Sequence, residues 1–446
     1  QFYQTSLGEY GVPPINTGTK SRNIELNDTI YWNQFTFNVG VLFSEDKLYG
    51  QGLKKNSSNV SGYELAPGNR YLMKKIGFGD MVQPRLGITY DVDDDISVFA
   101  NYARYYPSAS SLPRAAAWDR NLHSTIEANF DIDGNMIDVE PRDSSSGKFF
   151  QKGIDPRHVD EYLLGMNWVV SDTLTTRTHF RYRGARDFWE DTPNTTKVAY
   201  ACSTHPTLVG CMPEGWASEE LYIPDLQAYR DEVGGSSYVI AQLERSYTDY
   251  YEVSFEAEWQ YEKFYLTGSY TWSQYKGNFD QDNSTTTNDA NVFIGSSFIA
   301  DGRGRNLWDF KDGTLKGDRT HLFKLYGFYD LDWNAQFGFY GLYQSGQPWE
   351  TWDGGYYGYS SDVYRYSEKA GSRSSSYHVQ LDLNYVQNFP LGSDGRYNIQ
   401  LRADLFNVFN NQTGYNINPY LDSAGYGKPR NYFNPRRLQL MAKFLF

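Results

Sequence analysis

The chain of 446 residues has no run of about eighteen apolar residues, which excludes a membrane-spanning helix. It has only two cysteines and six histidines, and no two histidines stand at the spacing of a metal site. Its formal net charge is −13, which argues against a nucleic-acid-binding protein. No phosphate loop and no nucleophile elbow occurs. The sequence therefore predicts a protein that is not an enzyme and that holds neither cofactor nor metal.

Aromatic residues and glycine, by contrast, are abundant. Aromatics make up 17% of the chain, with 39 tyrosines, and there are 40 glycines. The mean hydropathy is nevertheless low, at −0.64. A chain that is polar on average but rich in Tyr, Trp and Gly fits either a secreted all-β protein or an outer-membrane β-barrel.

Alternation of apolar and polar residues is the main structural signal. In the last segment Phe446, Phe444, Ala442, Leu440 and Leu438 are apolar, and the residues between them are mostly polar. Because successive side chains of a strand point to opposite faces, such a segment is a β-strand with one apolar face. Twelve segments share this pattern: 35–43, 86–90, 96–102, 162–168, 174–182, 251–259, 266–272, 323–331, 335–343, 377–385, 397–405 and 438–446.

The connections between these segments alternate between short and long. Tight turns are expected near 91–95, 171–173, 260–263, 332–334 and 389–396. Long loops are expected at 44–82, 107–159, 191–247, 277–318, 348–376 and 411–435. Bacterial outer-membrane barrels have short periplasmic turns and long extracellular loops. The sequence thus predicts an all-β, antiparallel transmembrane barrel with a periplasmic C-terminus, whose last strand pairs on both edges because lipid offers no water to an open edge.

Several motifs resemble the C-terminal half of TonB-dependent outer-membrane transporters, closest to the Oar-like branch. The resemblance runs along nearly the whole chain. The motifs are QPRLGITYDV (83–92), IDPRHVDEYLLGMNW (154–168), YTWSQYKGN (270–278), GDRTHLFKLYGFYDL (317–331), GLYQSGQPW (341–349), LRADLFNVFNNQTGY (401–415) and the terminal Phe446.

This resemblance implies a barrel of twenty-two strands that encloses a plug domain, with a TonB box near the N-terminus. Residues 1–446 would supply the last twelve strands, since neither a plug pattern nor a TonB box is recognisable among them. The family binds ligand at extracellular loops and imports it with energy supplied through TonB. Peptide or protein is the cargo class of the Oar-like branch, and glycans and iron chelates are cargo of the wider family. Further implied partners are outer-membrane lipid, lipopolysaccharide and the barrel-assembly machinery, for which Leu440, Phe444 and Phe446 would be the signal.

Three other interpretations remain open. The chain is also compatible with a surface adhesion or structural barrel that does not transport. A complete twelve-stranded, autotransporter-like translocator is a second alternative. The long loops expected here argue against it, because translocators of that kind have short loops. A secreted, soluble β-protein is the third.

The two cysteines stand close together in the longest outer loop. Cys202 and Cys211 bracket STHPTLVG. An even count, close spacing and an exported context favour a disulfide between them, which would give this loop a fixed shape or simply stabilise it.

Aromatic residues gather in the long loops. Trp118 is one example, and the densest cluster is Trp349, Trp352, Tyr356, Tyr357 and Tyr359. Aromatic and glycine-rich loops on a rigid scaffold are typical of binding surfaces. The cluster is therefore a candidate ligand site, whereas for any single ring packing of the loops or a place at the membrane rim is the favoured explanation.

Opposite charges occupy the inward faces of two consecutive strands. Segment 174–182 and its continuation carry Arg177, Arg181 and Arg183, and segment 251–259 carries Glu252, Glu256 and Glu258. Counting from the two tight turns places Arg177 near Glu256 and Arg181 near Glu252. We expect an ion ladder on the wall of the lumen, with a charged track for cargo as the functional alternative.

Overall fold

The structure is a computed structural model of residues 1–446. It describes residues 3–7, 15–59, 62–109, 112–118, 124–143, 148–150, 153–193, 238–242, 246–279, 310–353, 365–392 and 397–446. Within these ranges every regular element is a strand except the short helix α1 (Leu112–Ala116). None of the helical structure in these ranges is long and apolar enough to cross a membrane.

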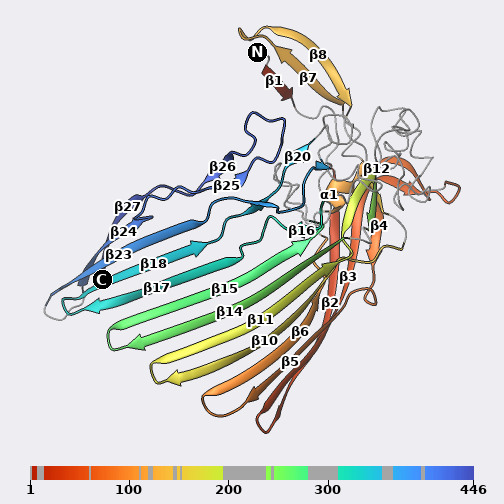
Figure 1. Cartoon of the computed structure of the whole chain (residues 1–446). Coiled ribbons are helices and arrows are strands. Elements are labelled where there is room, and N and C mark those ends of the chain that lie inside the picture. Colours follow the sequence, from red (N-terminus) through yellow and green to blue (C-terminus); the bar gives the residue numbers. More distant parts are fainter. Residues whose placement is uncertain are drawn as a thin grey trace.

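One 15-stranded sheet dominates the molecule (Figure 1), and thirteen of its strands follow one another in chain order as an antiparallel meander. They are β2 (Gly18–Trp32), β3 (Phe35–Lys55), β5 (Val82–Asp91), β6 (Ile96–Tyr105), β10 (His158–Ser171), β11 (Leu174–Arg186), β14 (Tyr247–Tyr261), β15 (Phe264–Gly277), β17 (His321–Leu331), β18 (Ala335–Gln344), β23 (His378–Leu391), β24 (Tyr397–Phe406) and β27 (Arg437–Leu445).

All twelve strands expected from the sequence occur, in the expected order, but the expected number is one too low. The additional strand is β2, which pairs with β3 through a tight turn at Asn33, a residue with φ of 50°. In β2 the apolar series Ile24, Leu26, Ile30 and Trp32 is interrupted by Asp28. The alternation was therefore too weak to recognise, although the pairing with β3 holds the strand in place.

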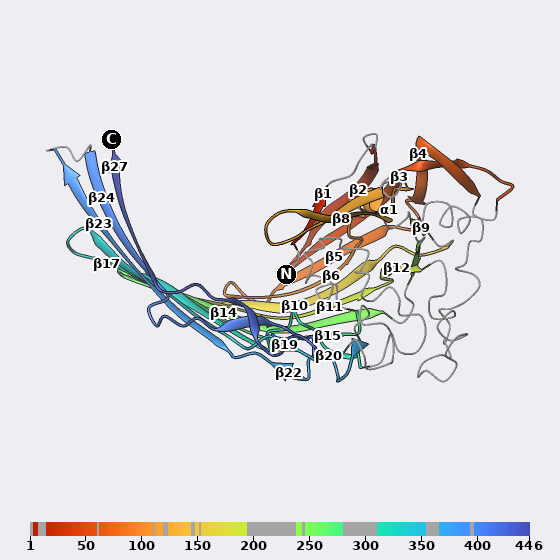
Figure 2. The ribbon, with the colours of Figure 1, turned by 90° about the horizontal axis from the view of Figure 1, so that it is seen from above.

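The two faces of the sheet differ as the alternation predicts. Phe180 of β11 and its cross-strand partner Val253 of β14 are 41% and 43% exposed. On the opposite face, the neighbouring His179 and Glu252 are buried. Seen from above, the sheet curves like part of a cylinder wall (Figure 2). Side chains crowd together on the concave side of a curved sheet and bury one another there. The buried side chains are the polar ones, so the polar face is the concave one.

The sheet is open rather than closed. Its two ends are β2 and β27, and among the described strands β27 pairs with β24 alone. The second paired edge expected for the last strand is therefore not supplied by the described part of this chain. Leu440, Phe444 and Phe446 are 73%, 54% and 92% exposed, and the ring of Phe444 stacks on that of Phe446 at 6.1 Å.

Several segments expected to be loops contain strands. β3 continues to Lys55 and pairs with β4 (Tyr63–Ile76), so that much of 44–82 is a hairpin. Small sheets join β1 (Tyr3–Leu7), β7 (Ser124–Phe130) and β8 (Met136–Asp143), and also β9 (Lys148–Phe150), β12 (Trp189–Pro193) and β13 (Tyr238–Gln242). Further short pairs are β19 (Pro348–Trp349) with β22 (Arg373–Ser374), β20 (Trp352–Asp353) with β21 (Arg365–Tyr366), and β25 (Gly414–Ile417) with β26 (Pro429–Tyr432); β16 (Gly313–Thr314) pairs with β15.

Among the described residues, the largest buried apolar cluster lies at the long-loop end of the sheet, where α1 and β12 lie in Figure 1. It includes Leu48, Met81, Leu112, Trp189 and Ile240. This end of the molecule therefore has a packed core of its own, which gives the loop-side elements fixed positions relative to the strands.

Candidate ligand-binding site

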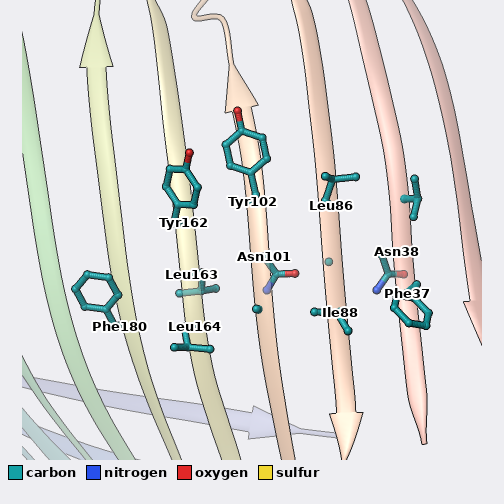
Figure 3. Close-up of a pocket in the computed structure, with 13 residues that line it drawn as sticks. Phe37, Asn38, Leu86, Ile88, Asn101, Tyr102, Tyr162, Leu163, Leu164 and Phe180 are labelled. Atoms are coloured by element: carbon teal, nitrogen blue, oxygen red, sulfur yellow. The ribbon is translucent and has the colours of Figure 1, made fainter. Parts of the chain in front are cut away.

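A hollow of about 670 Å³ lies among side chains on the apolar face of the sheet (Figure 3). Aliphatic and aromatic side chains of β3, β5, β6, β10 and β11 surround it, including Phe37, Ile88, Leu164 and Phe180. These side chains offer carbon surface and few polar atoms, so the hollow has little with which to orient a polar ligand.

A second cavity, of about 430 Å³, lies on the polar face at the long-loop end; we call it the arginine pocket. Its lining residues come from β10, β11, β14, β15 and the segments that flank them: Arg157, Val159, Arg181, Arg183, Ala185, Thr248, Tyr250, Glu252, Tyr275 and Gly317. Arg183 stands near the end of β11 and Tyr250 near the start of β14, which are the ends joined by the longest connection. The pairing of these strands thus places the pocket on the polar face, at the end where the long loops begin.

Glu252 is the centre of a hydrogen-bond network in this pocket. Its Oε1 lies 2.7 Å from Nε2 of His179, and its Oε2 accepts a bond of 2.6 Å from the hydroxyl of Tyr250. Arg181 adds an ion pair of 3.4 Å to the same Oε2. Three donors therefore hold one carboxylate that is almost fully buried, and buried charges require such partners.

The register expected for the two charged strands is confirmed. Arg177 lies opposite Glu256, and Arg181 lies opposite Glu252. Only the second of these pairs forms an ion pair among the described residues; the guanidinium of Arg177 instead covers the ring of Phe99 at 5.1 Å.

The remaining residues of the expected ion ladder do not form the expected pairs. Arg183 bonds Glu161 of β10 through Nε at 3.2 Å, and Arg181 approaches the same carboxylate at 3.8 Å. Glu256 and Glu258 are exposed and form no ion pair within the described ranges. The network thus spans β10, β11 and β14, and it is shorter along the strands than expected.

Arg157, Glu161, Tyr250 and Tyr275 were not among the residues expected at a site. Glu161 stands on the inward side of its strand, one residue from the apolar Tyr162, so the alternation itself contained this signal. Arg157 precedes β10 and had no strand to assign its direction. Its guanidinium lies over the ring of Phe188 at 4.4 Å.

Two of the aromatic residues in the long loops, Trp352 and Trp118, are buried. Trp352 is 5% exposed, stacks on Tyr366 at 5.4 Å and contacts the edge of Tyr420 at 5.5 Å. Trp118 is fully buried. Both rings therefore pack against other loop side chains, and contact of Trp352 with ligand stays a prediction.

Trp349 is more accessible than Trp352 and remains a candidate for contact with ligand. Its ring lies near Tyr426 at 6.0 Å and under the guanidinium of Arg373 at 5.2 Å. The other predicted members of the cluster, Tyr356, Tyr357 and Tyr359, lie outside the described residues, as do Cys202 and Cys211. No group of three metal-ligating side chains occurs where the structure describes the chain.

A buried carboxyl, that of Glu350, is hydrogen-bonded to Trp352 in this loop. Glu350 accepts hydrogen bonds from Nε1 of Trp352 at 2.6 Å and from the amide of Gly371 at 3.0 Å. Burial raises the pKa of Glu350, and the two hydrogen bonds only partly oppose this. The folded loop therefore binds a proton more tightly than the unfolded one does.

We expect the loop to become less stable as pH rises above the ordinary pKa of a glutamate, because the unfolded loop then releases its proton more readily. Glu350→Gln should abolish this decline. Hydrogen exchange of the amides at 349–353, corrected for its intrinsic pH dependence, measures the effect in both proteins between pH 4 and 8. Identical pH profiles for the two proteins would contradict the assignment.

Comparison with known proteins identifies solved structures of similar fold. No protein-family profile and no curated protein sequence matches the chain. Solved structures of outer-membrane receptors and transporters do match. The outer membrane transporter YddB from Escherichia coli has a TM-score of 0.54 at 11% identity, over 96% of this chain and 54% of that one. The siderophore receptor PiuA from Acinetobacter baumannii has a TM-score of 0.51 at 11% identity, over 96% and 43%.

The pyoverdine outer membrane receptor FpvA from Pseudomonas aeruginosa PAO1 gives a TM-score of 0.51 at 12% identity, over 98% of this chain and 44% of that one. At such identity the likeness shows the fold alone: an antiparallel sheet similar to part of the barrel in these structures. The chain spans about half the length of these structures or less.

Proposed function

We propose that these strands form the C-terminal part of the barrel of a TonB-dependent outer-membrane receptor. The receptor binds a ligand at its extracellular side and imports it with energy supplied through TonB. Further strands outside the described sheet would close the two open edges at β2 and β27, because a sheet edge in lipid leaves backbone groups without partners. Peptide or protein is the cargo class that we favour, from the resemblance to the Oar-like branch.

A belt of tyrosines on the apolar face is the observation that carries the membrane assignment. Tyr102, Tyr162, Tyr182 and Tyr251 lie side by side on four neighbouring strands, with ring centroids 4.9, 6.1 and 5.1 Å apart. Beyond them the same face becomes charged, beginning with the ion pair of Arg104 and Asp160. Aromatic girdles mark the two edges of the lipid-facing band in outer-membrane barrels.

The opposite edge of the band lies at the tight turns. On β14, Trp259 stands eight residues after Tyr251, which is about 26 Å along a strand. A tilt of about 40° reduces this to about 20 Å of height, close to the apolar band of about 25 Å in known barrels. The height of this band supports the proposal that β14 crosses the outer membrane between two aromatic girdles.

Labelling of single cysteines tests the orientation. In a background with Cys202 and Cys211 replaced by Ser, we expect Lys428→Cys, in the loop before β26, to react with an impermeable maleimide on intact cells. Asp172→Cys, in the tight turn between β10 and β11, should react only after the outer membrane is permeabilised. Equal labelling of the two positions on intact cells would overturn the membrane topology.

Energy dependence separates import from adhesion. Cells that carry the protein should deplete a peptide mixture faster than cells that lack it, and an uncoupler of the proton-motive force should abolish the difference. Retention of bound peptide that is unaffected by the uncoupler would favour a surface adhesion barrel instead.

A further inference from the structure

The arginine pocket has more positive than negative charge. Arg157, Arg181 and Arg183 line it, and Glu252 is the single acidic residue among the lining residues that the structure describes. A second carboxylate, that of Glu161, lies beside the pocket and pairs with Arg183. A chain with a net charge of −13 has thus gathered three cations around one cavity on its polar face.

Both carboxylates are already engaged. Glu252 serves three donors, as described above, and Glu161 is shared by Arg181 and Arg183. Arg183 uses its Nε for this pair, and neither of its Nη atoms has a hydrogen-bond partner among the described residues. Its side chain is 48% exposed. The outer fork of this guanidinium is therefore available to an anion that enters the cavity.

The remainder of the pocket is apolar or aromatic. Val159 and Ala185 are buried and pack with Phe188 and Phe279 behind them. The rings of Tyr250 and Tyr275 stand edge to face at 6.4 Å on the other side. Burial lowers the pKa of the Arg157 guanidinium; the nearby Tyr275 opposes this effect, and the charge of Arg183 adds to it.

We propose that the arginine pocket binds an organic anion: a free carboxylate on Arg183 and Arg157, joined to an apolar or aromatic body that lies against Val159, Ala185 and the two tyrosines. A planar carboxylate matches the fork of a guanidinium, and a cavity of about 430 Å³ falls in the size range of small-ligand sites. This inference rests on the proposed function, because the polar face is open to external ligand only when it lines the lumen.

Binding of defined probes to the full-length protein, purified from the outer membrane of its host, tests the inference. The probes are N-acetylphenylalanine, its neutral amide, the peptide alanyl-alanyl-phenylalanine and inorganic phosphate, followed by saturation-transfer NMR. We expect the free carboxylate to bind at least about tenfold more tightly than the amide, since hydrogen bonds to charged groups exceed those between neutral ones. Phosphate, which has no apolar body, should compete weakly.

Two variants locate the effect. Arg183→Gln should weaken binding of N-acetylphenylalanine about tenfold and leave the amide unchanged. Arg402→Gln is the matched control, because Arg402 also lies on the polar face and pairs with Asp404 at 2.8 Å, but on β24. Tighter binding of the tripeptide than of the small acid identifies a peptide terminus as the source of the carboxylate, and the reverse identifies a small acid.

Equal binding of carboxylate and amide, equal effects of the two variants, or full competition by phosphate would overturn the inference. These outcomes in a protein that still shows the expected cysteine labelling refute the pocket alone. A protein with the wrong labelling refutes the proposed function, whatever the probes show.

Discussion

Leu401→Arg should destabilise the folded barrel by about 2–4 kcal/mol, the cost of a cation on the lipid side near the midplane of an outer-membrane barrel. Leu401 stands in the middle of β24, is 44% exposed, and lies between its cross-strand partners Gln387 and Ala442. We therefore expect the exposed side chain of Leu401 to face lipid rather than water. The arginine would have to hold its charge in hydrocarbon or distort the strand to reach the interface.

Gln400→Arg is the matched control, one residue away on the polar face. Gln400 donates a hydrogen bond of 3.0 Å to Asn388, so an arginine there remains among polar groups and water. We expect little change in stability. Heat-modifiable gel migration and urea titration of the refolded protein in lipid measure both variants, and equal shifts would show that the assignment of the two faces is wrong.

The strand pattern was accessible from the sequence because it depends on neighbours along the chain. Alternation is a local property, and short turns fix register, so counting from the turns at 171–173 and 260–263 placed Arg181 opposite Glu252 correctly. The same reasoning failed at β2, where Asp28 stands in the apolar series. Pairing with β3 along the whole strand compensates for this one residue, and such compensation cannot be seen in the segment itself.

The pocket was less accessible, because it depends on contacts between strands and loops far apart in the chain. Glu161 meets Arg183 only once β10 and β11 are paired, and Arg157 reaches the cavity from outside any strand. Trp352 shows the same limit. An aromatic ring in a glycine-rich loop resembles a binding residue until the segment near Tyr420 covers it. Composition identifies the residue types of a site, whereas burial decides which of them can touch ligand.

Glu252→Ala should produce the second large effect, a loss of about 3 kcal/mol, because removing one partner of a buried pair leaves the others without compensation. Glu252 and His179 are both 7% exposed, and the carboxylate accepts from two further side chains. The cost should therefore far exceed that of a surface ion pair. Urea titration of the refolded protein in lipid gives the free energy of unfolding.

Double-mutant cycles divide this cost among the partners of Glu252. Coupling to Arg181 should be only about 0.2–1 kcal/mol, since the arginine is 33% exposed and its contact is 3.4 Å long. Coupling to His179, at 2.7 Å and out of water, should reach about 1.5–3 kcal/mol. The larger coupling to the histidine would mean that the buried contact sets the register of β11 on β14. Coupling to Arg181 that equals or exceeds coupling to His179 would instead assign Arg181 a structural role in setting that register.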